Sequence, residues 1–191
     1  MTAPYQTPPV GAPADIVFAA RAVLPVLSTD RLTLRPVTVE DTSAYAEIAC
    51  GEQGRYFSDA KSEDDAWGEF CQLAAGWLLH GHGGWTVQFH DAPEPLGFVL
   101  IGLEPGDETF ELGFMFRKSA EGRGIAFEAC TAARAYAFET LRLDALVSYI
   151  DTKNARAIAF AERLGATRDQ KAESAFNGSL CVFRHPKPEA A

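Results

Sequence analysis

The stretch that most constrains the fold is residues 110–141, where an alternating segment, a glycine-bearing turn and a helical segment follow one another directly. The alternation predicts a strand with one apolar face, which carries Phe110, Leu112, Phe114 and Phe116. Residues 125–141 contain no Gly or Pro, which favours a helix. The first N–H groups of a helix have no partner and the helix dipole favours negative charge there. The sequence Gly122-Arg123-Gly124 at this junction therefore predicts an anion cradle.

Composition limits the classes of partner. The chain has 191 residues, of which 47% are hydrophobic, so we expect one folded domain with a real core. The net charge of −9 argues against nucleic-acid binding, which needs clustered Lys and Arg. An acidic surface instead favours a cationic substrate such as an amine.

Neither a metal nor a membrane is indicated. The four cysteines lie far apart and form no C-x-x-C pair, so we expect no metal site and no redox motif. No apolar run approaches the ~20 residues of a membrane span. Residues 1–15 lack the charged start and apolar core of a signal peptide. These features predict a cytoplasmic protein with no membrane partner.

The chain divides into three parts. Residues 1–27 form a proline-rich flexible leader with a short apolar segment, residues 28–185 form a single domain, and residues 186–191 form a frayed tail. The apolar residues 16–27 have helical spacing and can pack over the domain, which is the simpler interpretation, or reach a partner subunit. A homodimer could form through this leader or through the final strands.

The domain alternates strands and helices. We expect strands at 31–35, 85–90, 96–103, 110–116 and 145–150, with two more around a turn at Asn177-Gly178. We expect helices at 38–49, 63–80, 125–141 and 155–164, and a hairpin turn at 91–95. The predicted fold is α/β (α+β): a mixed, mostly antiparallel twisted sheet of about 6–7 strands flanked by about 4 helices.

Three segments together resemble the GNAT superfamily of N-acetyltransferases. They read TDRLTLRP at residues 29–36, EGRGIA at 121–126 and NARAIAFAERLGA at 154–166. The likeness covers residues 27–185, and it is greatest to the branch that includes ribosomal-protein-alanine N-acetyltransferases. A GNAT-like fold is therefore implied.

The resemblance implies acetyl-CoA as the cosubstrate. The family loop reads Q/R-x-x-G-x-G/A, so Gly124 and Ala126 match its small positions, whereas Glu121 departs from the first position. Gly124 lets the backbone approach a pyrophosphate, and Arg123 can add a charge-assisted contact. The expected cofactor-binding loop comprises Glu121, Gly122, Arg123, Gly124, Ile125 and Ala126.

The resemblance also implies contacts to the rest of acetyl-CoA. The N–H groups around Met115 and Phe116 would grip the pantetheine and polarise the thioester carbonyl. Asn154 would bond the pantetheine arm or hold the splayed strands. By itself, the glycine turn could also be an ordinary strand–helix connection without a ligand. A Rossmann site is disfavoured because Phe127 occupies the position of the third glycine.

The reaction needs a base, because amines are mostly protonated at neutral pH. Glu111 is the first candidate, since it lies on the central strand opposite the Phe row. A salt-bridged or solvated strand carboxylate is the alternative. Tyr149 is a candidate acid toward the thiolate, or else a tyrosine at the edge of the core. Phe160 and Ala157 occupy positions where the family usually has Tyr and Ser, so another group, water or no acid at all serves the thiolate.

Two functions follow from these residues. The first is an acetyl-CoA-dependent N-acetyltransferase that acts by direct attack of a primary amine, either a protein N-terminus or a small molecule. The second is a non-catalytic acyl-CoA binding or sensing module of the same fold. Residues 51–62 and 80–84 would shape the acceptor site. Six further residues could either line the acceptor entrance or be ordinary loop and surface residues: Arg55, Tyr56, Phe57, His80, His82 and Trp85.

Overall fold

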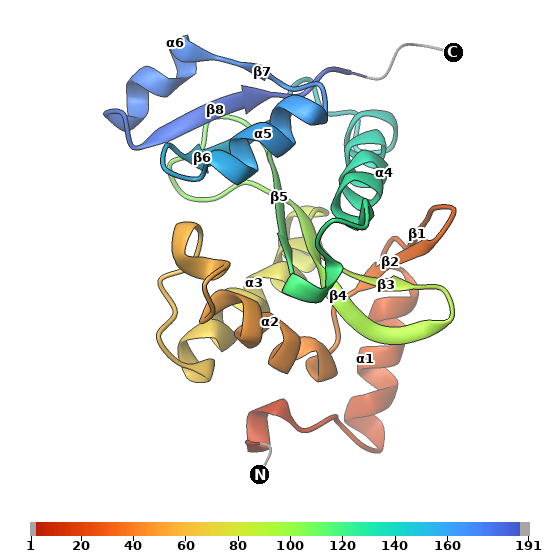
Figure 1. Cartoon of the computed structure of the whole chain (residues 1–191). Coiled ribbons are helices and arrows are strands. Elements are labelled where there is room, and N and C mark those ends of the chain that lie inside the picture. Colours follow the sequence, from red (N-terminus) through yellow and green to blue (C-terminus); the bar gives the residue numbers. More distant parts are fainter. Residues whose placement is uncertain (1–2, 188–191) are drawn as a thin grey trace.

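The computed structural model describes residues 3–187, which form one eight-stranded sheet and six α-helices (Figure 1). Residues 188–191 of the expected tail lie outside the described residues. The strand order is β1-β2-β3-β4-β5-β6-β8-β7, and β5–β6 is the parallel pair. The strands are β1 (Leu27–Ser28), β2 (Leu32–Pro36), β3 (Gly84–Phe89), β4 (Ala92–Gly102), β5 (Glu111–Phe116), β6 (Val147–Asp151), β7 (Thr167–Arg168) and β8 (Leu180–Arg184).

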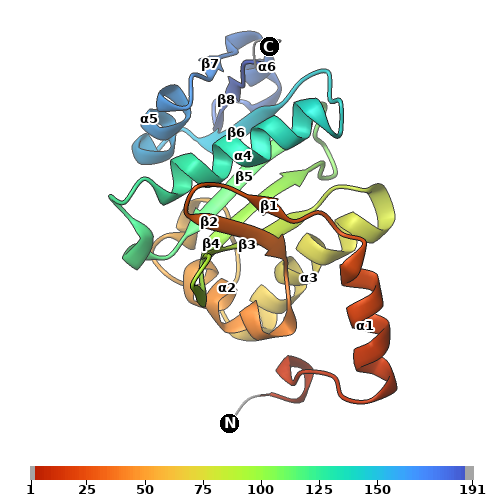
Figure 2. The same cartoon turned by 90° about the vertical axis from the view of Figure 1, so that its right-hand side faces the viewer.

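Helices cover both faces of the sheet. In Figure 2, α4 crosses in front of the sheet while α2 and α3 lie behind it. No helix within residues 3–187 is both long and apolar enough to span a membrane. The helices are α1 (Ala12–Ala22), α2 (Thr42–Ala49), α3 (Glu63–His80), α4 (Ile125–Glu139), α5 (Ala155–Arg163) and α6 (Gln170–Glu173).

The alternation of β5 separates two layers of core. Leu112 is fully buried on the α4 face, where Phe114 and Phe116 also pack. Met115 points to the other face and joins the cluster formed by α2 and α3. The predicted fold class is confirmed, and the extra elements are short or peripheral. Glu111 shares the Met115 face, so its side chain lies on the side of the sheet that α3 covers.

Two turns differ from the expectation. The β3–β4 hairpin turns at residues 90–91, because Phe89 pairs with Ala92, and not at 91–95. Pro93 and Pro95 are tolerated inside β4 because β5 first pairs with β4 at Gly97. The final connection also differs: β7 and β8 pair, but α6 and a 3-10 turn lie between them, where a second long strand was expected before Asn177.

The N-terminal apolar segment forms α1, which projects from the body of the domain (Figure 2). The interpretation that the whole segment packs over the domain is wrong for Ile16 and Val23, whose exposed fractions are 71% and 83%. Leu24 and Leu27 do pack against the core. Helical spacing predicts that the apolar side chains share one face of the helix, but it does not show whether another part of the domain packs against that face.

A buried ion pair holds β2 against the first turn before α2. Arg35 donates to both carboxylate oxygens of Asp41, at 2.7 and 2.8 Å. The Asp41 carboxylate also accepts from the Thr38 N–H and the Thr86 hydroxyl. Burial opposes ionisation, but these donors lower the pKa of Asp41 overall. The pair therefore fixes the N-terminus of α2 relative to β2 and β3.

Asp41→Asn should lower the free energy of unfolding by about 3 kcal/mol, because it leaves the Arg35 charge without its partner. Urea unfolding followed by circular dichroism measures this change. Glu52→Gln is the matched control, since the Arg55–Glu52 pair is exposed and should contribute less than about 1 kcal/mol. Equal effects of the two substitutions would contradict the assigned role of Asp41.

Candidate active site

The sheet is interrupted between β5 and β6. Their register contains the single pair Glu111–Val147, beside which the Val147 N–H donates to the Phe110 carbonyl at 2.9 Å. The next ladder bonds are replaced by side-chain bonds. The Ser148 hydroxyl donates to the Leu112 carbonyl at 2.7 Å, and the Tyr149 N–H donates to the Glu111 carboxylate at 3.4 Å. Past this point the strands do not pair, so a gap opens in the sheet.

The main-chain groups that face this gap follow from the hydrogen-bond alternation of an antiparallel pair. The Arg117 N–H donates to the Leu96 carbonyl of the neighbouring segment, at 2.9 Å. Alternate residues therefore direct their main-chain groups the other way, toward β6. Phe114 and Phe116 carry N–H groups that face the gap, whereas the main chain of Met115 faces β4. Of the two residues expected to offer N–H groups here, Phe116 directs its N–H toward the gap, whereas Met115 directs its N–H toward β4.

The gap opens into a cleft of about 1430 Å³ that runs between α3 and the starts of α4 and α5. Gly122, Gly124 and Asn154 line one end of it. Residues of loops 52–59 and 102–107 line the other end, with the end of α3. Glu111, Met115 and Tyr149 lie along the middle. One cleft therefore joins the predicted anion cradle to the candidate base.

The cradle has the geometry expected of an anion site. Gly122 and Gly124 adopt positive φ values of 70° and 75°, which favour glycine. Within residues 3–187, no carbonyl or side chain accepts a hydrogen bond from the N–H groups of Gly122, Gly124 or Ala126. Ile125 is fully buried and anchors the start of α4. Unpaired N–H groups at the N-terminus of a 15-residue helix attract anions.

Other predicted loop residues have protein partners. Glu121 forms an ion pair with Arg156 at 2.8 Å. The Arg123 guanidinium lies 4.9 Å from the ring of Phe89 and does not line the cleft, contrary to the contact expected of it. The Asn154 side chain caps α5 by accepting from the Ala157 N–H at 3.1 Å. Asn154 thus sits in the cleft wall with its carbonyl oxygen already used.

The start of α5 offers no proton donor at the two positions noted in the sequence. Phe160 lies in the cleft wall with its ring 4.6 Å from that of Phe114. Ala157 lines the cleft beside it. The cleft wall formed by these two positions is therefore apolar.

Glu111 faces the solvent of the cleft while protein surrounds its other sides. Burial is the main cause that raises the pKa of Glu111 to about 8; the Tyr149 N–H lowers this pKa, and the nearby carboxylates of Asp107 and Glu104 raise it. A carboxyl with this pKa can accept a proton near neutral pH. The candidate base is thus polar, accessible from the cleft and poised to titrate.

Tyr149 lies on the same face as Glu111. Its hydroxyl donates to the Thr109 carbonyl at 3.3 Å, and its ring packs 5.3 Å from that of Phe176. Burial and the charge of Asp107 raise the pKa of Tyr149. The phenol therefore stays protonated at neutral pH, so it can give a proton but cannot act as a base.

The end of the cleft formed by loops 52–59 and 102–107 contains acidic residues that were not predicted. Glu69, Glu104 and Asp107 line it, and none forms an ion pair with a Lys or Arg of the described chain. Burial raises the pKa of Glu104, as do the charges of Asp107 and Glu69. Glu104 and Asp107 share one loop, but Glu69 lies on α3, so no spacing in the sequence indicated that all three converge. The overall charge of −9 was the one available hint.

Most residues suggested for the acceptor entrance do line the cleft, namely Arg55, Tyr56, Phe57, His80 and His82. The suggestion was wrong for Trp85, which is fully buried and donates to the Pro25 carbonyl at 2.9 Å. The ring of His82 bonds the Ile101 carbonyl at 3.0 Å, and burial lowers its pKa. Residues 3–187 contain no group of three His, Cys, Asp or Glu side chains arranged to hold a metal.

Comparison with known proteins assigns the family. The model of the acetyltransferase (GNAT) domain matches residues 31–167, more than half of the chain. The chain belongs to the GNAT family. An acetyltransferase structure from Agrobacterium tumefaciens str. C58 is 35% identical and superposes with a TM-score of 0.80, over 86% of this chain and 95% of that one.

Two more distant relatives of this GNAT chain carry ribosomal names. A Bacillus subtilis (strain 168) protein, provisionally named ribosomal N-acetyltransferase YdaF, is 24% identical over 75% of this chain and 81% of its own length. A Vibrio cholerae structure, provisionally named ribosomal-protein-serine acetyltransferase, shares the fold, with 24% identity and a TM-score of 0.66 over 85% of this chain and 97% of that one. The resemblance predicted from the sequence is confirmed.

Glu111 should make stability depend on pH. Its pKa rises from an ordinary 4.5 to about 8 on folding, so the folded protein binds the proton more tightly than the unfolded chain does. The free energy of unfolding should therefore fall as the pH rises from about 4.5 to 8, by at most about 1.4 kcal/mol per pH unit. Urea unfolding of wild type and Glu111→Gln between pH 5 and 9 measures the difference. Parallel curves would contradict the raised pKa.

Proposed function

We propose that this GNAT protein transfers the acetyl group of acetyl-CoA to a primary amine by direct attack. The observation that carries the proposal is the single cleft that joins an unpaired N–H cradle, an open strand edge and the Glu111 carboxyl. GNAT proteins typically use acetyl-CoA. Those three features correspond to a pyrophosphate, a thioester and an amine proton.

The donor occupies the cradle end of the cleft in this proposal. The N–H groups of Gly122, Gly124 and Ala126 bind the pyrophosphate. The Phe116 N–H faces the gap and binds the pantetheine or the thioester carbonyl, with the Met115 side chain beside it. Asn154 contributes its amide N–H₂ to the arm, since its oxygen caps α5. Glu121 and Ile125 act by holding the loop, through Arg156 and the core.

Glu111 takes the amine proton in this proposal, directly or through a water. Its pKa of about 8 is close to that of an α-amine, near ~8, so the proton transfer has little energetic cost. The freed amine lone pair attacks the thioester carbonyl, and strand N–H groups stabilise the oxyanion. The carbon–sulfur bond then breaks, and Tyr149 donates its proton to the departing thiolate. The second proton of the attacking nitrogen leaves through cleft water to the Tyr149 phenolate, so the products are a neutral amide and the CoA thiol. Holding both reactants contributes ~7–11 kcal/mol to lowering the barrier.

The acceptor is an amine that carries a second positive charge in this proposal. Within residues 3–187, Glu69, Glu104 and Asp107 form no ion pair, and the one Arg at that end of the cleft, Arg55, pairs with Glu52. A small diamine supplies two charges, and so does a peptide whose N-terminus lies next to a Lys or Arg. The ribosomal names of two relatives make a protein N-terminus one acceptor to test.

Binding of acetyl-CoA tests the donor half. Millimolar acetyl-CoA should raise the melting temperature of the wild type, and Gly124→Glu should abolish the shift, because it puts a side chain and a negative charge at the N-terminus of α4. Gly178→Glu is the matched control, since Gly178 also has a positive φ, of 78°, but lies outside the cleft lining. No shift for the wild type would contradict the proposal.

Thiol release over a panel of monoamines, diamines and short peptides tests the catalytic half. Glu111→Gln should lower kcat/KM by about 10²–10⁴-fold at pH 8 and leave acetyl-CoA binding intact. Glu104→Gln should instead raise KM for dicationic acceptors while sparing kcat, because Glu104 contributes charge and not proton transfer. A wild type that binds acetyl-CoA without turning over any acceptor would favour the non-catalytic acyl-CoA module.

A further inference from the structure

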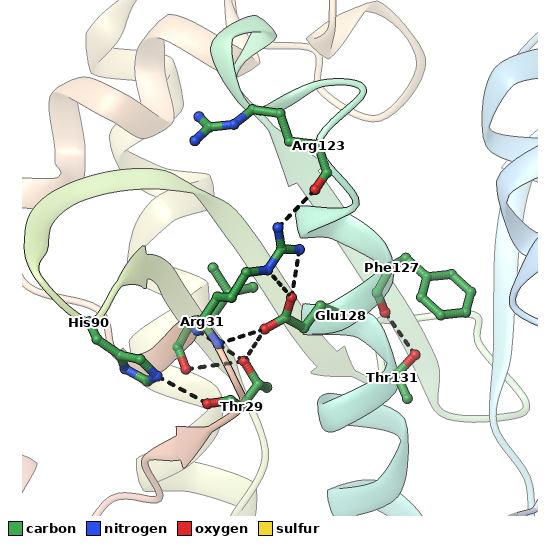
Figure 3. Close-up of polar contacts among 8 residues, drawn as sticks. Thr29, Arg31, His90, Arg123, Phe127, Glu128 and Thr131 are labelled. Carbon is green, nitrogen blue, oxygen red and sulfur yellow. Dashed lines mark hydrogen bonds and ion pairs between the residues drawn. The ribbon is translucent and has the colours of Figure 1, made fainter.

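The TDRLTLRP segment at residues 29–36 is far in sequence from the cleft, and the proposed chemistry does not use it. Figure 3 shows that its first half reaches α4 just after the cradle. The Thr29 hydroxyl donates to the Glu128 carboxylate at 2.5 Å. Arg31 donates to the same carboxylate from its backbone N–H at 3.0 Å and from Nε at 2.7 Å. Three donors from one turn therefore hold a side chain in the first turns of α4.

Arg31 also contacts the cradle itself. Its Nη1 donates to the Arg123 carbonyl at 3.2 Å (Figure 3). Its Nη2 would lie 3.5 Å from a Cβ added to Gly124. Through this hydrogen bond, segment 29–36 contacts the peptide group between Arg123 and Gly124.

The contact to the Arg123 carbonyl determines where the next N–H points. In a trans peptide, the carbonyl of Arg123 and the N–H of Gly124 point in opposite directions. Arg31 holds the carbonyl on the β2 side, so the Gly124 N–H is directed away from β2. That N–H has no acceptor within residues 3–187, and Gly124 lines the cleft.

His90 holds the residues on either side of Arg31 in place. His90, just after β3, bonds the Thr29 carbonyl through Nε2 at 3.0 Å (Figure 3). Its Nδ1 bonds the Thr33 hydroxyl at 2.9 Å. Burial opposes ionisation of Glu128, but the bonds from Thr29 and Arg31 lower its pKa overall, so the carboxylate stays charged. Arg31 is thus held by an ionised partner and is not free to follow a ligand.

We propose that Arg31, held by Glu128, is a positioning residue that orients the Arg123–Gly124 peptide so that the Gly124 N–H faces the cleft. The inference rests on the proposed function, since the ligand of that N–H would be the CoA pyrophosphate. It assigns a role to Arg31 of the TDRLTLRP segment, although the Arg31 guanidinium takes no part in the proposed chemistry. It also explains why the Arg123 side chain need not contact the ligand, because only its carbonyl matters.

The test measures CoA binding by isothermal titration, together with the Gly124 amide signal in NMR spectra. Arg31→Met should weaken CoA binding by about tenfold or more, the loss expected when a charged hydrogen-bond donor is removed. In the wild type, the Gly124 amide proton should shift downfield on saturation with CoA, and this shift should shrink in Arg31→Met. A residue that only supports the fold would not alter that single signal at saturation.

Glu128→Gln separates two roles for Arg31. If Arg31 positions the peptide, loosening its partner should weaken CoA binding. If Arg31 were itself a phosphate ligand, releasing it from Glu128 should tighten CoA binding, and that result would overturn the proposal. Glu128→Gln also serves as the independent variant should Arg31→Met fail to fold.

Arg168→Met is the matched control, because it breaks the Arg168–Glu173 ion pair at the far end of the sheet and should leave CoA binding unchanged. Wild-type CoA affinity in Arg31→Met would overturn the positioning role alone. Absence of CoA binding in the wild type would instead overturn the proposed function on which it rests.

Discussion

The missing ladder between β5 and β6 is the constraint on which the site depends. A continuous sheet would pair the main-chain groups of Phe114 and Phe116 and leave nothing for a ligand. Two side chains end the ladder, since Ser148 takes the Leu112 carbonyl and Glu111 takes the Tyr149 N–H. Glu111, whose carboxylate replaces a ladder bond at this point, is therefore also the candidate base. Opening the sheet and placing the carboxyl are one structural event.

The charges of the molecule are arranged around that opening. In the part of the chain that the structure describes, the cradle end offers unpaired N–H groups at the start of α4, and the other end offers carboxylates that form no ion pair. An anionic donor and a cationic acceptor would thus enter from opposite ends and meet at Glu111. The apolar wall formed by Phe114 and Phe160 lies between, where a pantetheine arm would need no charge.

The two arginines of the 29–36 segment support the site from outside it. Arg35 is held by Asp41 and fixes α2 relative to the sheet, whereas Arg31 contacts the cradle loop through Glu128 and the Arg123 carbonyl. Both arginines have several hydrogen-bond partners, which suits the planar, multidentate guanidinium better than a lysine. Segment 29–36 thus supports the structure around both halves of the cleft.

Local patterns in the sequence were enough for the element types, the fold class and the glycine turn. Alternation and helical spacing report which face is apolar, and only glycine adopts the positive φ of Gly122 and Gly124 without strain. They were not enough for Trp85 or α1, because burial depends on what lies opposite. Nor could they show that Glu69, Glu104 and Asp107 gather beside Glu111, or that Glu128 meets Arg31. Glu69 and Glu128 are far in the chain from the residues that they meet, and only the packing of α3 and α4 on the sheet brings these charges together.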